Sequence, residues 1–281
     1  MGSANPPYLD QQGKPFLRES ITAFLDILGF SHAVVSAAAD GKSQQCLDSI
    51  STALDETRAV VRNTLSLNEL AEPGRWALKF FSDNLLLGCP CDAHGDAADA
   101  ALFVVQCTQH YQLQMAIKGF FVRGALALGP LCITDDIIFG TSLIESYQLE
   151  AKAAIVPRVI LIEKIFNLIA DRKKSADRAA RASVNNLLCR DIDGWWFVNY
   201  LQAAVGTNGV DWRLIQQHKA SVLASLSHSA RHDILPKFGW VSRYHNVFCH
   251  WHRDLPGYSD EFRIQRVDEE SAIHRLSDSD D

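Results

Sequence analysis

The chain has 281 residues, with 27 Lys and Arg against 33 Asp and Glu, for a net charge of -6 at pH 7. This length fits one globular domain with an elaboration, or two small domains, and it is sufficient for a full hydrophobic core without disulfide or metal support. A net negative chain lacks the diffuse positive field that non-specific nucleic-acid binding requires. We therefore expect no nucleic-acid partner.

Neither a membrane span nor a secretory signal is expected in this sequence. It contains no uninterrupted apolar run of about 18 residues. Its N-terminus is polar and rich in proline, whereas a signal peptide begins with positive charge followed by an apolar stretch. The seven cysteines are odd in number and scattered through apolar segments, which is typical of reduced thiols. These features predict a cytoplasmic protein without a membrane partner.

Strand-like and helical patterns alternate along the first part of the chain. Their order is typical of an α+β fold of the split βαβ, or ferredoxin-like, class, with an antiparallel-containing sheet and helices on one face. In chain order we expect a strand at 20–30, a helix at 44–65, a hairpin at 76–88, a helix at 96–116, strands at 120–128 and 131–139 around Gly129-Pro130, a helix at 142–153 and a strand at 157–162.

Composition divides the chain into four parts. We expect an irregular N-terminal arm at residues 1–18, an α+β core at 19–165, a mainly helical C-terminal extension at 166–265 and an acidic disordered tail at 266–281. Within the extension, residues 191–200 are expected to form the edge of a strand pair. Residues 191–194 (DIDG) begin like a calcium-binding loop but lack its later ligands.

Two carboxylates stand where apolar strands are expected to end. Asp26 follows a run of apolar residues, and Asp83 lies at the tip of the expected hairpin or just before it. A charge in such a run must be exposed, paired or bound to a metal, because burying it alone costs several kcal/mol. If the two strands are neighbours, the carboxylates converge and suit a hard divalent ion such as Mg²⁺. The simpler alternative is that Asp26 caps a helix and Asp83 is an ordinary turn residue.

Four segments carry a resemblance to a known family. They are residues 23–30 (AFLDILGF), 79–88 (KFFSDNLLLG), 122–130 (VRGALALGP) and 136–150 (DIIFGTSLIESYQLE). In this order they resemble the motifs of class III nucleotidyl cyclases, although that family usually has Gly where this chain has Ser82. The resemblance covers roughly residues 20–162 and implies a class III cyclase core.

Two segments of the C-terminal extension resemble one group within this family. Residues 193–201 (DGWWFVNYL) and 237–246 (KFGWVSRYHN), with the departures in the fourth motif, resemble the bacterial pyrimidine cyclases of the antiphage system called Pycsar. Those enzymes make cyclic UMP or cyclic CMP as an alarm signal for a co-encoded effector, which the cyclase does not contact directly. The resemblance therefore implies an antiphage signalling enzyme.

The resemblance also assigns the metal and phosphate ligands. It implies that Asp26 and Asp83, with the backbone carbonyl of Ile27, hold two Mg²⁺ or Mn²⁺ ions per site. Such ions lower the pKa of the attacking 3′-hydroxyl and neutralise the triphosphate. Phosphate oxygens are expected to accept hydrogen bonds from the backbone after Gly29, where Phe30 opens a helix.

Other family positions have changed identity. The transition-state Asn and Arg of the family fall on Ile144 and Gln148, and neither residue matches. Either another cation, such as Arg123 or Lys152, stabilises the pentavalent phosphorus, or catalysis depends more on the metals.

The base-contacting positions of the family fall on Lys79 and Thr141. Lys79 can only donate, which suits the 4-carbonyl of uracil and opposes the amino group of cytosine. The expected function is therefore conversion of UTP to cyclic UMP by a homodimer with composite active sites. The alternatives are a cytidylate, adenylate or guanylate cyclase, or a catalytically silent nucleotide-binding module that regulates a partner.

Overall fold

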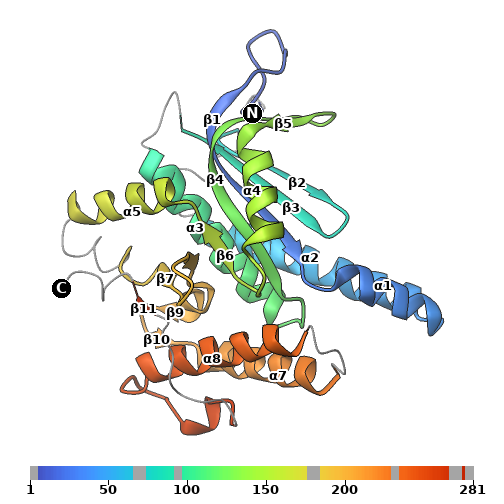
Figure 1. The fold of residues 1–281 in the computed structure, drawn as a ribbon, viewed down its shortest axis with the longest axis vertical. Helices are drawn as coiled ribbons and strands as arrows, with labels where there is room; N and C mark the ends of the chain where they lie inside the picture. Colours follow the sequence, from blue (N-terminus) through green and yellow to red (C-terminus); the bar gives the residue numbers. More distant parts are fainter. Residues whose placement is uncertain are drawn as a thin grey trace.

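One mixed sheet runs through the molecule and carries most of its helices on its faces (Figure 1). Within the described part of the chain the sheet has nine strands, in the order β11-β7-β8-β6-β4-β1-β3-β2, with β5 paired to β4 outside this path. The computed structural model describes residues 6–65, 74–91, 97–175, 184–228, 234–265 and 274–275.

The first half of the chain forms the predicted split βαβ arrangement. Strands β4, β1, β3 and β2 are neighbours in that order, and every neighbouring pair is antiparallel. The α+β prediction of a ferredoxin-like core is confirmed by this topology. In chain order the elements are β1 (Arg18–Ile27), α1 (Phe30–Ala39), α2 (Ser43–Leu65), β2 (Ala77–Phe81), β3 (Asn84–Pro90), α3 (Ala97–Ala116), β4 (Val122–Ile133), β5 (Ile138–Gly140) and α4 (Thr141–Lys152).

Strand β4 is longer than the sequence predicted. The expectation of two strands separated by Gly129-Pro130 is wrong, because β1 continues to pair with β4 on both sides of this dipeptide. Ser20 lies opposite Gly129, and Glu19 lies opposite Pro130. Only the short β5 forms beyond the end of β4. A Gly-Pro pair therefore does not interrupt a strand that is held by a long ladder.

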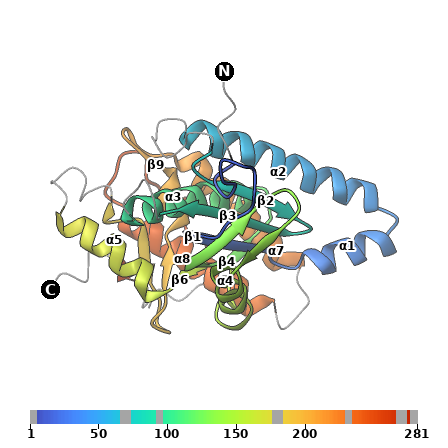
Figure 2. The same cartoon turned by 90° about the horizontal axis from the view of Figure 1, so that it is seen from above.

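Helices cover both faces of the sheet, as Figure 2 shows with α2 and α3 on one side and α4 on the other. Ile21 and Leu25 of β1 pack into the core that includes α3 residues. On the opposite face, the hydroxyl oxygens of Thr22 and Ser142 lie 2.7 Å apart, and the rings of Phe24 and Tyr147 meet edge to face at 5.6 Å. The expectation of helices on one face is wrong, because β1 is buried on both faces and α4 covers the face that carries Thr22 and Phe24.

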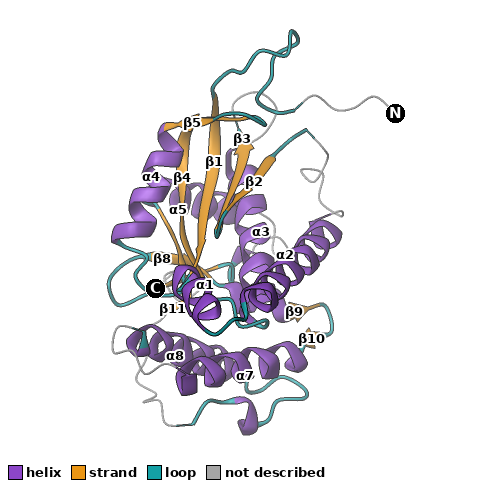
Figure 3. Ribbon diagram, turned by 90° about the vertical axis from the view of Figure 1, so that its right-hand side faces the viewer, coloured by secondary structure: helices purple, strands orange, loops and turns teal. Residues whose placement is uncertain are grey.

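The sheet continues into the C-terminal part of the chain. Strand β6 pairs with β4 in parallel, and β8, β7 and β11 follow. Helices α7 and α8 lie side by side beyond one end of the sheet (Figures 1 and 3). The elements are β6 (Val159–Leu161), α5 (Glu163–Ser175), β7 (Leu188–Arg190), β8 (Trp196–Val198), η2 (Tyr200–Ala204), β9 (Val205–Gly206), β10 (Gly209–Val210), α7 (Trp212–His228), α8 (Leu235–Trp251), η3 (Asp260–Phe262) and β11 (His274–Arg275).

No helix among the described residues has the length and apolar character that crossing a membrane requires. Most of the acidic tail expected at residues 266–281 lies outside the described residues.

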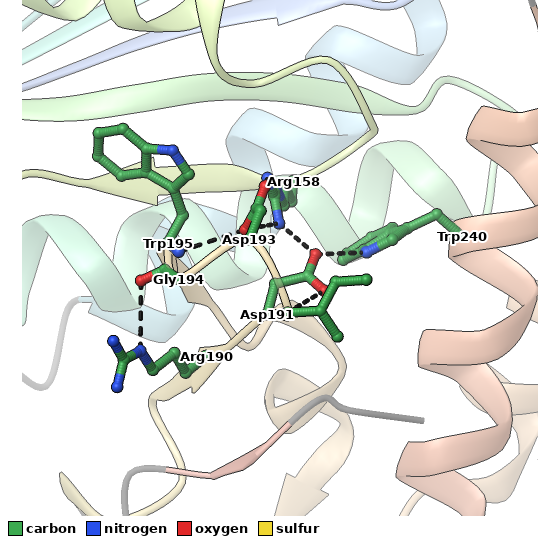
Figure 4. Close-up of polar contacts among 8 residues, drawn as sticks. Arg158, Arg190, Asp191, Asp193, Gly194, Trp195 and Trp240 are labelled. Carbon is green, nitrogen blue, oxygen red and sulfur yellow. Dashed lines mark hydrogen bonds and ion pairs between the residues drawn. The ribbon is translucent and has the colours of Figure 1, made fainter. Parts of the chain in front are cut away.

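A buried ion-pair cluster joins the C-terminal helices to the sheet (Figure 4). Arg158, which is 3% exposed and precedes β6, forms ion pairs with Asp191 and Asp193 of the β7–β8 turn. Trp240 of α8 donates from Nε1 to Asp191 at 2.7 Å. The carboxylates of the calcium-like DIDG segment are thus partners of a guanidinium. The backbone amide of Gly124 donates to the Arg158 carbonyl at 3.1 Å, so the same residue also secures β4.

The cluster predicts different costs for its two carboxylates. Asp191→Asn should lower the free energy of unfolding by about 3 kcal/mol, because it removes one partner of a buried ion pair. Asp193 is 45% exposed, so Asp193→Asn should cost less than about 1 kcal/mol. Urea unfolding of both variants measures the difference. Equal losses of unfolding free energy would show that burial does not make the ion pair of Asp191 stronger than that of Asp193.

Candidate active site

The ends of β1 and of the β2–β3 hairpin bring Asp26 and Asp83 together. Asp26 lies opposite Asn84, the first residue of β3, in the antiparallel ladder. The amide of Ile27 donates to the carbonyl of Asp83 at 3.2 Å, which fixes the hairpin tip against the end of β1. Asp83 stands in the two-residue turn, as the sequence predicted. The convergence expected if the two strands were neighbours is therefore present.

The turn itself is strained at the residue before Asp83. Ser82 has a φ of 55° and is the only non-glycine residue of the described chain with a positive φ. A side chain in this left-handed conformation costs about 1–2 kcal/mol, and glycine avoids that cost. The backbone at Ser82 thus has a conformation that glycine would adopt without strain.

A guanidinium lies between two of the carboxylates of the site. Arg123 of β4 is the cross-strand neighbour of Asp26, and its Nε donates to Asp26 Oδ2 at 3.1 Å. Its Nη2 lies 2.7 Å from Oε1 of Glu150, which comes from α4. Asp26, Arg123 and Glu150 therefore form a chain of ion pairs on the α4 face of the sheet.

The pKa values of the two partly buried acids reflect this crowding. Burial raises the pKa of Asp26, the Arg123 guanidinium lowers it, and the charge of Asp83 raises it. Burial also raises the pKa of Glu150, with Arg123 acting against the shift and Asp26 and Asp83 adding to it. Burial is the main cause of both shifts, and the neighbouring carboxylates add to it.

The net negative charge of the site fits a divalent cation. When ionised, three carboxylates and one guanidinium carry a net charge of -2, from three negative groups and one positive group. Asp26 and Asp83 provide the oxygen ligands that Mg²⁺ or Mn²⁺ prefers, and water or phosphate can complete the coordination. No group of three or more His, Cys, Asp or Glu side chains arranged to hold a metal occurs within the described ranges. Any ion held here thus relies on the two aspartates, backbone and substrate oxygens.

The N-terminus of α1 follows β1 directly. Gly29 is its N-cap and has a φ of 78°, and no side chain caps the helix. Phe30, half-buried, is the first helical residue. The unpaired amides of the first helical turn favour anions, so phosphate oxygens can bind beside Asp26. Phe30 opens a helix after Gly29, as the sequence predicted.

The predicted base-contacting residues lie elsewhere on the same chain. Lys79 of β2 donates to Asp135, in the β4–β5 loop, at 2.7 Å. Thr141 is the first residue of α4, whereas Glu150 stands nine positions later. That separation is about 13 Å along the helix axis. The structure therefore does not bring Thr141 to the carboxylates of its own chain.

The remaining predicted residues are exposed on α4. Ile144, Gln148 and Lys152 all have solvent-accessible side chains, and none of them contacts the Asp26–Arg123–Glu150 chain through a hydrogen bond or ion pair that the structure describes. Sequence reasoning named Arg123 but missed Glu150 and Asp135. A glutamate within a helix and an aspartate within a turn give no signal by themselves, because both are usually exposed there.

Comparison with known proteins gives distant structural similarity. No protein-family model and no curated protein sequence matches the chain. The adenylyl cyclase CyaB from Pseudomonas aeruginosa aligns with a TM-score of 0.45 and 13% identity, over 65% of this chain and 94% of its own.

Two further solved structures are similar at the same level. A class III adenylyl cyclase-like ATP-binding protein from Pseudomonas aeruginosa aligns with a TM-score of 0.39 and 13% identity, over 54% of this chain and 35% of its own. A bacterial light-regulated adenylyl cyclase aligns with a TM-score of 0.41 and 12% identity, over 67% of this chain and 55% of its own. Similarity this distant identifies no activity for the chain.

The turn geometry predicts a stabilising substitution. Ser82→Gly should raise the free energy of unfolding by up to about 1 kcal/mol, because glycine relieves the positive φ. The same change at Ser51, an exposed residue within α2, should lower it by about 0.5 kcal/mol because glycine weakens helices. Denaturant unfolding of both variants measures whether each substitution raises or lowers the free energy of unfolding. A loss of stability in Ser82→Gly would contradict strain at the turn.

Proposed function

We propose that the chain is a nucleotidyl cyclase that converts UTP to cyclic UMP and pyrophosphate. The observation that carries this proposal is the convergence of Asp26 and Asp83 beside the N-terminus of α1. A reaction of this kind needs oxygen ligands for divalent ions next to a binding site for phosphate oxygens, a requirement that it shares with other nucleotidyl- and phosphoryl-transfer reactions.

The residues of the site have separable tasks in this reaction. Mg²⁺ or Mn²⁺, two ions per site, would activate the 3′-hydroxyl and neutralise the triphosphate. Asp26 and Asp83 would hold these ions, with the carbonyl of Ile27 as a third ligand. The backbone amides that follow Gly29 would orient the phosphates for in-line attack at the α-phosphorus. Positioning and charge compensation, rather than a protein nucleophile, therefore account for catalysis.

A complete site requires a second copy of the chain in this proposal. Thr141 and the carboxylates lie at opposite ends of α4, and Lys79 is paired with Asp135, so in this proposal each chain holds two incomplete halves. Exposed apolar side chains lie on the hairpin tip, on β5 and its loop, and on α4, where a second copy would cover them. They are Phe81, Ile137, Phe139, Ile144 and Tyr147.

The base preference follows from the hydrogen-bonding groups available. Lys79 supplies donors only, and its neighbour Asp135 supplies acceptors. Uracil presents its 4-carbonyl beside an N–H group, so the pair can satisfy both at once. A mismatched base would leave buried polar groups unpaired, at about 1–3 kcal/mol each. The proposed preference is therefore UTP over CTP, and pyrimidines over purines.

The proposed biological role is antiphage signalling in the cytoplasm, with cyclic UMP acting on a separate effector. Its support is the resemblance of two C-terminal segments. In the structure these segments form the β7–β8 turn with β8, and the first part of α8, and Trp240 joins them through Asp191. The segments thus secure the sheet and do not reach the carboxylates.

A catalytically silent nucleotide-binding module is the second candidate. It is favoured by Ile144 and Gln148, which stand where the resembled family has its transition-state Asn and Arg. Retention of Asp26 and Asp83 at one point favours catalysis, because a module that only binds nucleotide has no need for two crowded carboxylates. Product formation separates the two candidates.

Incubation with an equal mixture of UTP, CTP, ATP and GTP in the presence of Mn²⁺ tests the activity and its base preference together. Cyclic UMP should be the main product by mass spectrometry. Asp26→Asn and Asp83→Ala should each reduce product at least 100-fold, because each removes a metal ligand. Asp171→Ala, which changes an exposed carboxylate on α5, should leave product formation unchanged.

Two outcomes would contradict this proposal. Cyclic CMP or a cyclic purine nucleotide as the main product would refute the base argument. Full turnover in a well-folded Asp83→Ala variant would refute the metal assignment, and no product from any nucleotide would favour the silent module.

Mixed variants test the composite site. Asp83→Ala and Lys79→Ala should each be inactive alone, because each damages a different half of every site. Mixing the two proteins should restore part of the activity, since a heterodimer regains one intact site. Gel filtration with light scattering should show a dimer in both. No recovery after mixing, or full activity in a monomer, would mean that one chain forms a complete site.

A further inference from the structure

Glu150 is a buried charge to which the proposed function gives no task. It is 4% exposed, although it lies on a helix whose neighbouring positions are mostly exposed. Burying a carboxylate is costly unless a cation compensates it. The Nη2 atom of Arg123 lies 2.7 Å away and supplies that cation. The buried carboxylate of Glu150 on α4 is therefore compensated by Arg123.

Arg123 in turn controls one oxygen of Asp26. Its Nε donates to Oδ2 of Asp26 at 3.1 Å, while its Nη2 faces Glu150. A guanidinium is planar and rigid, so two carboxylates that pair with different nitrogens of it restrict its orientation. With Oδ2 held in this way, Oδ1 of Asp26 remains for a metal ion.

The same geometry argues against a direct role for Arg123 at the phosphorus. A cation placed between two carboxylates is largely neutralised, since Arg123 already donates to Asp26 and forms an ion pair with Glu150. Moving it to the substrate would leave Glu150 buried without a partner, which is strongly destabilising.

We propose that Glu150 is a positioning residue for the metal site: it anchors Arg123, and Arg123 orients Asp26 so that one oxygen faces the metal. This inference rests on the proposed function, because it requires a metal at Asp26. Ligating carboxylates generally need such hydrogen-bonded partners, and loss of a partner weakens metal affinity about 10–100-fold.

Mn²⁺ binding by the full-length protein, measured by electron paramagnetic resonance without nucleotide, tests the inference. Glu150→Gln should weaken Mn²⁺ binding about 10-fold or more, since it removes one negative charge and releases Arg123 to bind Asp26 more fully. Arg123→Lys should weaken Mn²⁺ binding as well, because lysine keeps the positive charge but lacks the planar set of donors of a guanidinium. The double variant should be no weaker than the worse single variant, since both act through one contact chain.

Asp191→Asn is the matched control. It also breaks a buried ion pair, at the Arg158 cluster, and should destabilise the fold without changing Mn²⁺ affinity. Circular dichroism establishes that each variant is folded. High Mn²⁺ should restore turnover of Glu150→Gln towards the wild-type kcat, which a simple loss of stability would not allow.

The outcomes separate this inference from the proposed function. Unchanged Mn²⁺ affinity in folded Glu150→Gln and Arg123→Lys would overturn the positioning role while leaving the cyclase proposal intact. A lower kcat at saturating Mn²⁺ with normal affinity would assign Arg123 to the transition state instead. Wild-type Mn²⁺ binding that survives Asp26→Asn would remove the metal site, and both proposals would fail.

Discussion

The candidate site depends on one charge at the end of a strand that is buried on both faces. Strand β1 is buried between α3 and α4, yet its penultimate residue is Asp26. The chain compensates that charge from both neighbouring elements. Arg123 binds it across the ladder, and Glu150 of α4 holds Arg123. A site that remains negative after this pairing is suited to receive a cation from solution.

The sheet order explains how residues far apart in the sequence meet at this point. In the order β4-β1-β3-β2, the last strand of the core returns beside the first, so Arg123 lies next to Asp26 despite 97 positions of separation. The hairpin occupies the other side of β1 and places Asp83 at the same end. The Arg158 cluster stabilises the far side of β4 through the carbonyl that accepts from Gly124. Long-range pairing therefore builds the site.

Element types were largely predictable from the sequence, whereas charge partners were not. Periodicity identified the α2 helix and the hairpin, because both signals lie within one short segment. The unbroken β4 was missed, since Gly129-Pro130 is a strong local signal that a long ladder overrides. Glu150 was missed because its burial depends on the packing of α4 across β1 and β4. The sequence around Glu150 does not indicate that packing. Asp191 and Asp193 were weighed as calcium ligands, and only the tertiary structure shows their guanidinium partner.

The distance between Thr141 and the carboxylates limits how one chain could bind a nucleotide. Helix α4 carries Thr141 at one end and Glu150 at the other, and helices are too stiff to bend these ends together. A nucleotide whose phosphates bind beside Asp26 thus cannot place its base at Thr141 of the same chain without spanning that length. The exposed ring of Tyr147 packs against Phe24 midway along α4, and the exposed residues of this stretch include the apolar Ile144 as well as the polar Glu145 and Gln148. In the proposed dimer, a second copy would bring its base-contacting residues to these carboxylates and would exclude water from the site.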